Sequence, residues 1–430
     1  FIPCKEARIS LTNNFINLFC PAYFMEKSDL IPVIKKDVSF GIEKNINNWE
    51  EKNLKNFGVD LSFSDVREFE RTKHIHRLHP YLGKFIPQLA NVFLKKYFKK
   101  DDWILDPFMG SGTTLIESNV LGMNSVGVEL SVFNTLISKV KTNKYDLKKV
   151  EYEIKDILKK TEIFSKISSN NQKKIEEEKI NINTNSDYLK KWFSNSALKE
   201  ILFYRSLIQN YENKDLLKII LSRATRSARQ VPHYDLARPT KPFKEKYFCI
   251  KHKRYCEPVT EALKFISRYS LDTIKRLKEF EKLRTDKQLI ILQEDSRTIK
   301  LPISVKIDGI FTSPPYLGLI DYHEQHKYAY ELFGFENNDK REIGPMSKGQ
   351  GAKAREEYKE GIINVLKNMS KYLKDKAKVF IVVNDKYGIY PKIANESGFI
   401  IRDIFHRPVL NRTERDNYKF SESIYYFEKS

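Results

Sequence analysis

The chain has 430 residues, of which 41% are hydrophobic and 13% aromatic, and its formal net charge is +20. This composition predicts a folded protein with a sizeable core and excludes wholesale disorder. The excess of Lys and Arg favours nucleic acid as a partner, although a general richness in Lys would give the same charge. Four cysteines are too few for a disulfide scaffold, and no apolar run is long enough to span a membrane, so a cytoplasmic protein without a membrane partner is expected.

The first part of the chain contains one clear pattern of secondary structure. Residues 1–73 have a mixed composition that predicts no particular element. From residue 79 a loop is expected to lead into a helix that begins near Pro87, because Pro suits the first helical turn. Residues 103–130, WILDPFMGSGTTLIESNVLGMNSVGVEL, then follow the order strand, Gly-rich turn, helix, turn, strand. This order is typical of the start of a doubly wound α/β sheet.

The middle of the chain differs from both flanks. In residues 143–288 Lys, Glu, Asn and Leu dominate, and apolar residues recur at helical spacing. Strand-like sequence returns at 288–295, 306–316, 377–385, 399–410 and 422–430. We therefore predict one α/β domain made of residues 74–142 and 289–430, interrupted by a helical insert at 143–288.

The segment Asp106–Thr114, DPFMGSGTT, carries the first chemical motif. Gly110 and Gly112 allow a sharp turn and a close approach of the backbone to a ligand. The turn opens a helix whose free N–H groups favour an anion, and Asp106 could accept a hydrogen bond from an ammonium group. A Gly-rich turn is also typical of nucleotide sites, but the residues around this one suit the amino-acid end of S-adenosylmethionine.

Two acids follow at predicted strand ends. Glu129, in SVGVEL, could hold both hydroxyls of a ribose, although a solvated acid at a strand end is common. Its position after the Gly-rich unit favours the ribose role. Asp295, in QEDSRTI, could accept a hydrogen bond from an adenine amino group, and equally could be a turn residue or a helix cap.

The motif TSPPY, Thr312–Tyr316, directly follows the apolar strand-like segment DGIF. Its two prolines fix a rigid turn at the carboxyl end of the strand. Such a turn could aim the Ser313 hydroxyl and the Pro314 carbonyl at one amino group, whose lone pair would then face a methyl donor. Tyr316 could stack on a base taken out of the double helix. An ordinary strand-ending turn is the alternative, and the donor motif upstream weighs against it.

Together these motifs resemble the DNA amino-methyltransferases, which carry a Gly-rich S-adenosylmethionine motif and Asp, Asn or Ser followed by Pro-Pro and an aromatic residue. The resemblance covers residues 74–142 and 289–428, and implies a Rossmann-like sheet that binds S-adenosylmethionine. It also implies that residues 79–87, HPYLGKFIP, pack beside the methionine moiety. The expected cofactor-binding residues are Lys84, Phe85, Pro87, Asp106, Pro107, Phe108, Gly110, Ser111, Gly112, Thr113, Thr114, Glu129, Asp295 and Thr312, and the expected catalytic residues are Ser313, Pro314, Pro315 and Tyr316.

Ser313 in the catalytic motif is similar to the N4-cytosine enzymes, as is the Asp-Pro-Phe form of the donor motif. The resemblance therefore implies site-specific transfer to N4 of cytosine in double-stranded DNA, in a prokaryotic cytoplasm at the nucleoid. The alternatives are an N6-adenine enzyme, an RNA methyltransferase, and a non-catalytic DNA-binding protein of a restriction or defence system. A cytosine-C5 enzyme needs a nucleophilic Cys, and the only Pro-Cys pair, Pro3-Cys4, is remote from the donor motif. No nuclease signature is evident, so restriction would come from a partner protein.

The insert is the candidate region for target recognition or for clamping DNA. Residues 223–247 mix Arg, Lys, His and Tyr, which suits phosphate contacts and base readout, and equally suits a solvated basic loop. We expect Arg226, Arg229 and Arg238 to bind DNA. The family usually places its recognition region elsewhere than before the third strand, so this insert departs from the family pattern.

The insert also holds a group of metal-binding residue types. Cys249, His252 and Cys256 form CIKHKRYC, and His233 lies upstream. Two Cys and two His could build a structural zinc site. Their spacing is not that of a standard zinc finger, so the sequence predicts no metal and leaves these residues as candidates.

Two further segments follow the catalytic motif. His323, Glu324 and His326 do not have the spacing of a zinc protease motif, and we interpret them as contacts to the target strand or as helix caps. Residues 341–358 are rich in Gly and Lys and are expected to form a mobile loop that could close on DNA.

Overall fold

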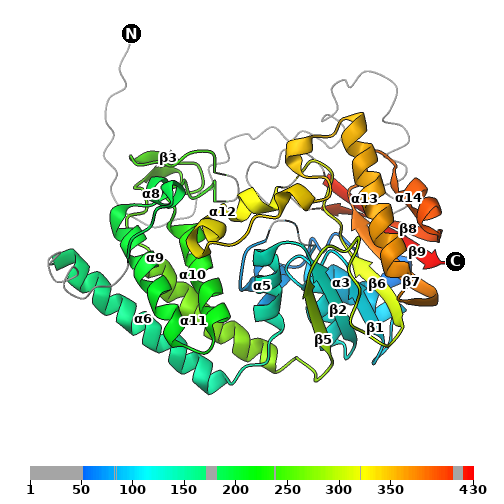
Figure 1. Ribbon diagram of the computed structural model, residues 1–430, viewed down its shortest axis with the longest axis horizontal. Coiled ribbons are helices and arrows are strands. Elements are labelled where there is room, and N and C mark those ends of the chain that lie inside the picture. Colours follow the sequence, from blue (N-terminus) through cyan, green and yellow to red (C-terminus); the bar gives the residue numbers. More distant parts are fainter. Residues whose placement is uncertain are drawn as a thin grey trace, which may run out of the picture. The chain divides into compact units, whose positions relative to one another are not determined.

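The computed structural model describes residues 52–81, 83, 85–170, 182–236, 239–319, 321–409 and 420–430. Residues 1–51 of the N-terminal region, together with Lys84 and Arg238, therefore lie outside the described residues. Within these described ranges, seven strands form one sheet in the order β5-β2-β1-β6-β7-β9-β8 (Figure 1). These strands are β1 (Trp103–Asp106), β2 (Asn124–Glu129), β5 (Leu289–Gln293), β6 (Ile307–Thr312), β7 (Leu373–Val383), β8 (Phe399–Val409) and β9 (Phe420–Lys429).

The strand directions create a crevice in the middle of the sheet. β1 pairs in parallel with β2 on one side and with β6 on the other, while β5 and β7 extend the parallel part outwards. β9 runs antiparallel to both of its neighbours, β7 and β8. The strand order reverses between β1 and β6, and open α/β sheets bind ligands beyond the carboxyl ends of the strands at such a point. The predicted Rossmann-like α/β fold is confirmed.

Helices cover both faces of the sheet. Consecutive strand residues point to opposite faces, so that Ile104 and Phe311 join the apolar cluster under α3, whereas Leu105 and Ile310 join the cluster under α13 and α14. Burial on both faces explains why these strands read as continuous apolar runs. The helices are α3 (Pro87–Tyr97), α13 (Ala352–Ser370) and α14 (Tyr390–Ser397).

Local sequence signals set several helix boundaries. Pro87 occupies the first turn of α3, as predicted. The hydroxyl of Ser131 accepts a hydrogen bond from the backbone N–H of Asn134 and caps α5 (Val132–Thr142). The expected mobile loop at 341–358 is only partly a loop, because α13 already begins at Ala352, where Ala, Lys, Arg and Glu favour a helix.

Between α5 and β5 the chain forms the helical insert. Its elements are α6 (Leu147–Asn170), α8 (Asp187–Trp192), α9 (Asn195–Leu207), α10 (Lys214–Ala228), a hairpin of β3 (Tyr247–Cys249) and β4 (Arg254–Cys256), and α11 (Leu263–Glu281). In Figure 1, α6, α9, α10 and α11 lie side by side. Their apolar faces share one core with α5 and with α12 (Tyr322–Phe333), because Ile137, Ile220 and Tyr328 belong to the same cluster. Among the described residues, no helix combines the length and apolar content that a membrane span requires.

The two ends of the insert meet beside the sheet. The guanidinium of Arg284 donates hydrogen bonds to the carbonyls of Asn143 (2.7 Å) and Thr142 (3.3 Å). The side chain of Asn119, at the end of α4 (Thr113–Val120), bonds to the backbone of Thr285 in both directions. These contacts bring β5 back alongside β2, although 159 residues, 130–288, separate the two strands.

Candidate active site

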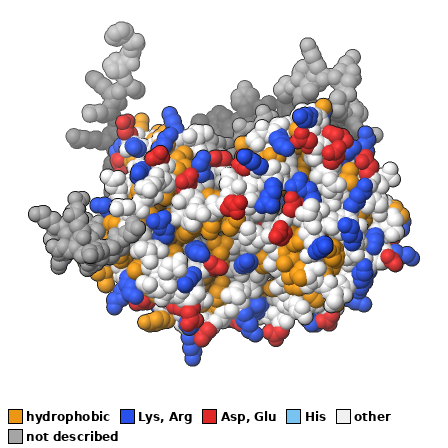
Figure 2. Space-filling model, viewed as in Figure 1, with side chains coloured by type: hydrophobic (Ala, Val, Ile, Leu, Met, Phe, Trp, Pro, Cys, Tyr) orange, Lys and Arg blue, Asp and Glu red, His pale blue; other side chains and the backbone are white. Residues whose placement is uncertain are grey.

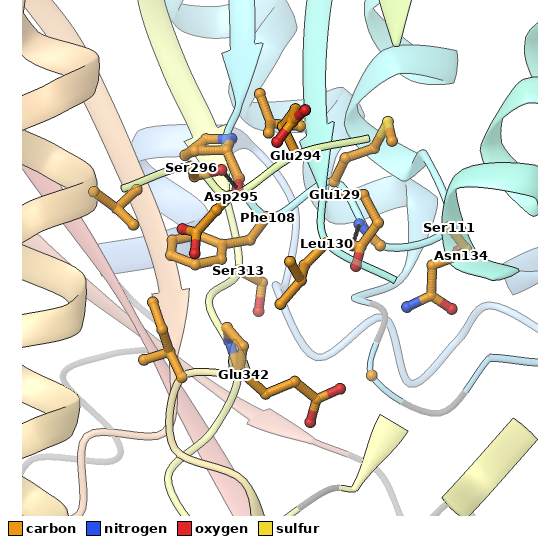
Figure 3. A pocket seen from close by; sticks show the side chains of 18 of the residues that line it. Phe108, Ser111, Glu129, Leu130, Asn134, Glu294, Asp295, Ser296, Ser313 and Glu342 are labelled. Atoms are coloured by element: carbon orange, nitrogen blue, oxygen red, sulfur yellow. Dashed lines mark hydrogen bonds between the residues drawn. The ribbon is translucent and has the colours of Figure 1, made fainter. Parts of the chain in front are cut away.

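A hollow opens at the carboxyl ends of β1, β2, β5 and β6 (Figure 3). It contains about 810 Å³ of free space, including its mouth, and lies at the point where the strand order reverses. Of the expected site residues, those that line it are Phe85, Pro107, Phe108, Gly110, Ser111, Thr113, Glu129, Asp295, Ser313 and Pro315. Those that do not line it are Pro87, Asp106, Gly112, Thr114, Thr312, Pro314 and Tyr316.

The Gly-rich turn forms one wall of the hollow. Gly110 and Gly112 have φ angles of +52° and +79°, in the left-handed region that side chains with a Cβ rarely adopt. A Cβ at Gly110 would lie 3.0 Å from the ring of Tyr81, a tight contact that would require the ring to move slightly. The hydroxyl of Ser138, on α5, donates a hydrogen bond to the Gly110 carbonyl (2.9 Å) and fixes the turn from below.

Helix α4 begins within this turn and directs its amino end at the hollow. Ser111 and Thr113 line the cavity at the first turn of the helix. The ammonium of Lys141, which is fully buried, donates to the Ser111 carbonyl at 3.0 Å. The free N–H groups and the dipole at a helix amino end attract an anion such as a ligand carboxylate.

Glu129 ends β2 and faces the hollow (Figure 3). One carboxyl oxygen accepts from the N–H of Gly110 and the other from the N–H of Ser131, each at 2.8 Å. Burial raises the pKa of Glu129 to about 7, although these two hydrogen bonds oppose the shift. Each oxygen of a carboxylate has a second lone pair, so the group can still accept from two ligand hydroxyls.

Asp106, at the end of β1, is only 2% exposed and joins the donor motif to the catalytic motif. Its carboxyl accepts hydrogen bonds from the Thr312 hydroxyl (2.6 Å) and from the N–H of Phe108 (3.1 Å). Burial raises the pKa of Asp106 to about 6 against these bonds. The sequence predicts that Asp106 accepts from a ligand ammonium, whereas its contacts in the structure connect the ends of β1 and β6.

Asp295 follows β5 and lines the hollow, as does Ser296 beside it. The guanidinium of Arg297 makes a two-pronged contact with the Asp295 carboxyl, with a shortest distance of 2.6 Å. Burial opposes ionisation here, but the hydrogen bonds from Arg297 lower the pKa of Asp295 below its ordinary value. Asp295 is therefore an ionised acceptor at neutral pH.

The TSPPY motif begins at Thr312, the last residue of β6, and its turn lies at the carboxyl end of that strand, as the sequence predicts. Ser313 and Pro315 line the hollow, and Ser313 lies between Phe108 and Glu342 in Figure 3. Tyr316 does not line the hollow, because its ring packs against the apolar cluster under α13. Its hydroxyl donates to Glu422 of β9 at 2.8 Å, which anchors the far side of the turn to the sheet.

Comparisons with known proteins identify the family. The DNA methylase family model matches residues 13–139. The chain is 42% identical to Type II methyltransferase M.MjaII of Methanocaldococcus jannaschii, over 88% of this chain and 84% of that protein. The chain belongs to the Type II DNA methyltransferases. It is an S-adenosylmethionine-dependent enzyme that methylates an amino group in DNA, as the motifs predict.

More distant relatives align over shorter stretches. Type II methyltransferase M.MvaI of Kocuria varians is 27% identical over 60% of this chain and 55% of that protein. Type II methyltransferase M.BsoBI of Geobacillus stearothermophilus is 25% identical over 64% of this chain and 55% of that protein. A solved methyltransferase from Pyrococcus furiosus aligns with a TM-score of 0.30 at 10% identity, over 91% of this chain and 99% of that chain. That similarity is too low to carry an argument, so the fold of the methyltransferase rests on its own strand order.

The acid that lies opposite Glu129 in the methyltransferase belongs to no recognisable sequence motif. Glu342 lines the hollow from the loop after α12, and its Oε1 accepts from Nδ1 of His323 at 2.7 Å. The Nε2 of His323 accepts from the N–H of Asn338, so the ring proton is on Nδ1 and the tautomer is fixed. Burial raises the pKa of Glu342.

The interpretation of His323, Glu324 and His326 requires correction. His323 and His326 are 5% and 1% exposed, and therefore neither can contact a target strand directly. The helix cap is Asp321, whose carboxyl accepts from the N–H of Glu324. His326 stacks on Tyr81 at 5.9 Å, and burial lowers its pKa to about 3, so a neutral ring supports the cavity wall.

The expected DNA contacts of the methyltransferase are not all at its surface. Arg229 is 3% exposed, and its guanidinium donates to the carbonyls of Arg226 (3.0 Å) and Leu236 (2.8 Å). This burial argues against a direct phosphate contact by Arg229. On the face in Figure 2, Lys and Arg are spread among acidic side chains instead of forming one basic patch. The sequence could supply the charge of these residues but not their burial.

Proposed function

We propose that the enzyme transfers a methyl group to N4 of cytosine at a specific sequence in double-stranded DNA. The observation that carries this proposal is that a serine, Ser313, occupies the first position of the catalytic turn. Ser313 lines the hollow at the end of β6. A serine in this position is similar to the N4-cytosine enzymes. The proposal places the enzyme in the cytoplasm, where it meets chromosomal DNA.

We assign the parts of the hollow to the parts of the cofactor. The amino end of α4, with Lys141 beneath it, suits the methionine carboxylate. Glu342, on the opposite wall, suits the methionine ammonium, because its Oε2 is buried and finds no hydrogen-bond partner among the described residues. Glu129 would accept from the ribose hydroxyls, and Asp295 with Ser296 would face the adenine.

Asp106 then acts through Thr312 and not by direct contact. The hydrogen bond between Asp106 and Thr312 links the start of the donor turn to the start of the catalytic turn. Holding these two turns in one geometry fixes the distance between the methyl group and the base. Positioning of two reactants contributes a large part of the rate in many enzymes.

The catalytic turn would prepare the amine for attack. The lone pair of an exocyclic amine is delocalised into the ring, which makes it a poor nucleophile. The Ser313 hydroxyl and the Pro314 carbonyl would accept hydrogen bonds from the two N–H groups of the amine and leave its lone pair directed at the cofactor. When bound, S-adenosylmethionine supplies an electrophilic methyl group. Its transfer would exchange a sulfur–carbon bond for a nitrogen–carbon bond, and the amine held by Ser313 and Pro314 would then release one proton to solvent.

The target base must leave the double helix to reach this turn. Tyr316 is partly exposed, and the hydrogen bond from its hydroxyl to Glu422 holds the ring in one orientation. A fixed aromatic ring offers a stacking surface with little entropy to lose. We therefore retain Tyr316 as the residue that stacks on the extruded base.

We assign recognition of DNA to the helical insert, residues 143–288. The insert carries the hairpin β3–β4, whose residues Lys251, Lys253 and Arg254 are exposed. These side chains can reach a phosphate, whereas Arg229 cannot. Recognition by the insert would place the sequence-reading surface before β5 in the chain.

The test of the proposed base is a direct measurement of the product. The gene is expressed in a host that lacks DNA amino-methylation, and its DNA is digested to nucleosides for mass spectrometry. N4-methylcytosine is expected, and a Ser313→Ala strain should show almost none. N6-methyladenine in its place would assign the enzyme to the adenine class, since adenine also presents an amine beside a ring nitrogen. An absence of both bases would refute the assigned activity.

A further inference from the structure

Four metal-binding side chains meet at the edge of the helical insert. Cys249 ends β3 and Cys256 ends β4, while His252 lies in the turn between the strands. His233 comes from the segment after α10. One ligand atom from each of the four residues can be chosen so that all four atoms lie within 4.8 Å of one another.

The distances between these atoms fit a tetrahedral metal site. The Sγ of Cys249 is 3.8 Å from Nδ1 of His233, and Nδ1 of His252 is 3.4 Å from the Sγ of Cys256. Zinc bonds of about 2.3 Å to sulfur and about 2.0 Å to nitrogen give tetrahedral edges of roughly 3.3–3.8 Å. The four groups therefore need little movement to surround one ion.

The strand pairing explains why both thiols point to the same place. Tyr247 pairs with Cys256, and Cys249 is two residues beyond Tyr247 on its strand. Side chains two residues apart share a face of a hairpin, so Cys249 and Cys256 lie on one face. Both are free thiols and both are buried, whereas His252 is exposed, so the protein would cover the site on its thiol side.

The hairpin buries too few apolar side chains to be stable by itself. Its two strands have three residues each, and the buried members of its cluster are Tyr247, Cys249 and Cys256. A two-stranded hairpin of this size is marginal in water without a further constraint. Lys253 in its turn also has a φ of +51°, a conformation that costs energy for a residue with a Cβ.

We propose that His233, Cys249, His252 and Cys256 bind one structural Zn²⁺ ion. Two thiolates and two imidazoles are the donor set of a closed four-coordinate zinc site, and two thiolates neutralise the charge of the ion. Binding replaces the two thiol protons, which are released to solvent. None of the four residues lines the cofactor hollow, so the ion takes no part in methyl transfer.

The ion would fasten the hairpin to the body of the insert. His233 belongs to a segment that begins at Gln230, whose N–H donates to the carbonyl of Trp192 in α8 (2.8 Å). The backbone N–H of His233 donates to the hydroxyl of Tyr247 at 3.3 Å, which connects this segment to β3. Ligands from the hairpin and from this segment make the metal a cross-link between two parts of the chain.

The first test is metal content of the full-length protein, purified without chelators or a metal-affinity tag. Mass spectrometry of the metals should find about one zinc ion per chain. The double variant Cys249→Ser with Cys256→Ser should lose it, while Cys4→Ser with Cys20→Ser should keep it. Cobalt(II) exchanged into the wild type should give thiolate charge-transfer and tetrahedral ligand-field absorption. Wild-type protein without zinc and without these cobalt bands overturns the proposal.

A second pair of variants covers the case in which the cysteine variant does not fold. His252 is exposed, so its substitution removes little packing. His252→Cys should retain zinc, because a thiolate can replace an imidazole in a tetrahedral site. His252→Ala should release zinc to a chelator at least tenfold faster than the wild type, with S-adenosylmethionine binding unchanged. Equal release rates for His252→Ala and the wild type would overturn the four-ligand assignment.

Discussion

The carboxyl end of the sheet and the helical insert differ in how their polar residues are used. At the sheet end, polar groups sit directly after strands, and the backbone holds them around a hollow, as with Glu129 between two N–H groups. In the insert, charged residues occupy helices and loops. The apolar periodicity of these segments does not determine which charged side chains are buried and which are exposed. Arg229 is buried there and bonds to carbonyls. Charge near a strand end is thus a better guide to function than charge within a helical insert.

Among the variants that test this comparison, we expect the largest change in activity from a substitution in the catalytic turn. Ser313→Ala removes an acceptor that is used at the reacting amine, so turnover should fall by about 10²–10³-fold, as for loss of one preorganised hydrogen-bonding group. Cofactor affinity should change little. Single-turnover assays and calorimetry separate these two quantities. Ser347→Ala is a suitable control because Ser347 is exposed and does not line the hollow. Equal loss of affinity and rate in Ser313→Ala would show a general disturbance of the site.

The link between the donor and catalytic turns should contribute to stability as well as to rate. Thr312→Val removes the 2.6 Å hydrogen bond from the Thr312 hydroxyl to the buried Asp106 carboxyl, which should lower the free energy of unfolding by about 1.5–3 kcal/mol. Turnover should fall because the two turns lose a shared anchor. Denaturant unfolding measures the first effect, with the exposed Thr298→Val as its control. If both variants are equally stable, Thr312 does not support Asp106.

The two kinds of basic residue in the insert can be separated by the salt dependence of DNA binding. Replacing Lys251, Lys253 and Arg254 by Gln should weaken binding and reduce the salt slope by up to about 2.7, if each side chain contacts one phosphate. Arg229→Gln should instead lower the melting temperature and leave the slope unchanged, because its partners are carbonyls. Binding titrations at several salt concentrations give both slopes. A reduced slope in Arg229→Gln alone would reverse the comparison.

The smallest expected effect is a pH dependence of cofactor affinity. Burial raises the pKa of Glu129 to about 7 and that of Asp106 to about 6. A cofactor that needs an ionised Glu129 should bind up to about tenfold more weakly for each pH unit below 7. The stability of the protein without cofactor should depend on pH in the opposite direction. The raised pKa of Glu129 in the folded state stabilises the protein at low pH, and this contribution is lost as the pH rises through 7. Calorimetric titrations from pH 5.5 to 8.5 would detect the first trend, and a flat profile would contradict it.

The sequence predicts the sheet and many of the residues that line the hollow, because short contiguous motifs specify them. The Gly-rich turn needs left-handed φ angles and close packing, which only certain residues allow, so Gly110 and Gly112 identify it. Strand, turn and catalytic residues are also adjacent in the chain at Thr312 and Ser313. These parts of the site depend on local geometry, which sequence patterns record.

The other parts of the site depend on packing between distant segments. Glu342 reaches the hollow from a loop without a recognisable motif, and His323 orients it from α12. The wrong interpretation of His323 and His326 has the same origin, because their burial comes from neighbours such as Tyr81. Spacing alone also could not place His233 beside Cys249, since a tertiary fold closes that gap.

The separation of β2 from β5 has a consequence for the synthesis of the protein. Within the described part of the chain, β5 lies at one edge of the sheet and pairs with β2 alone, and the ribosome makes 159 residues between them. At about 5–20 residues per second, the β5 side of β2 stays without its partner strand for roughly 8–32 seconds. An unpaired strand edge is a site of aggregation, so the nascent chain should need protection during this interval. The exposure ends when β5 pairs with β2 and Arg284 forms its hydrogen bonds to the carbonyls of Thr142 and Asn143.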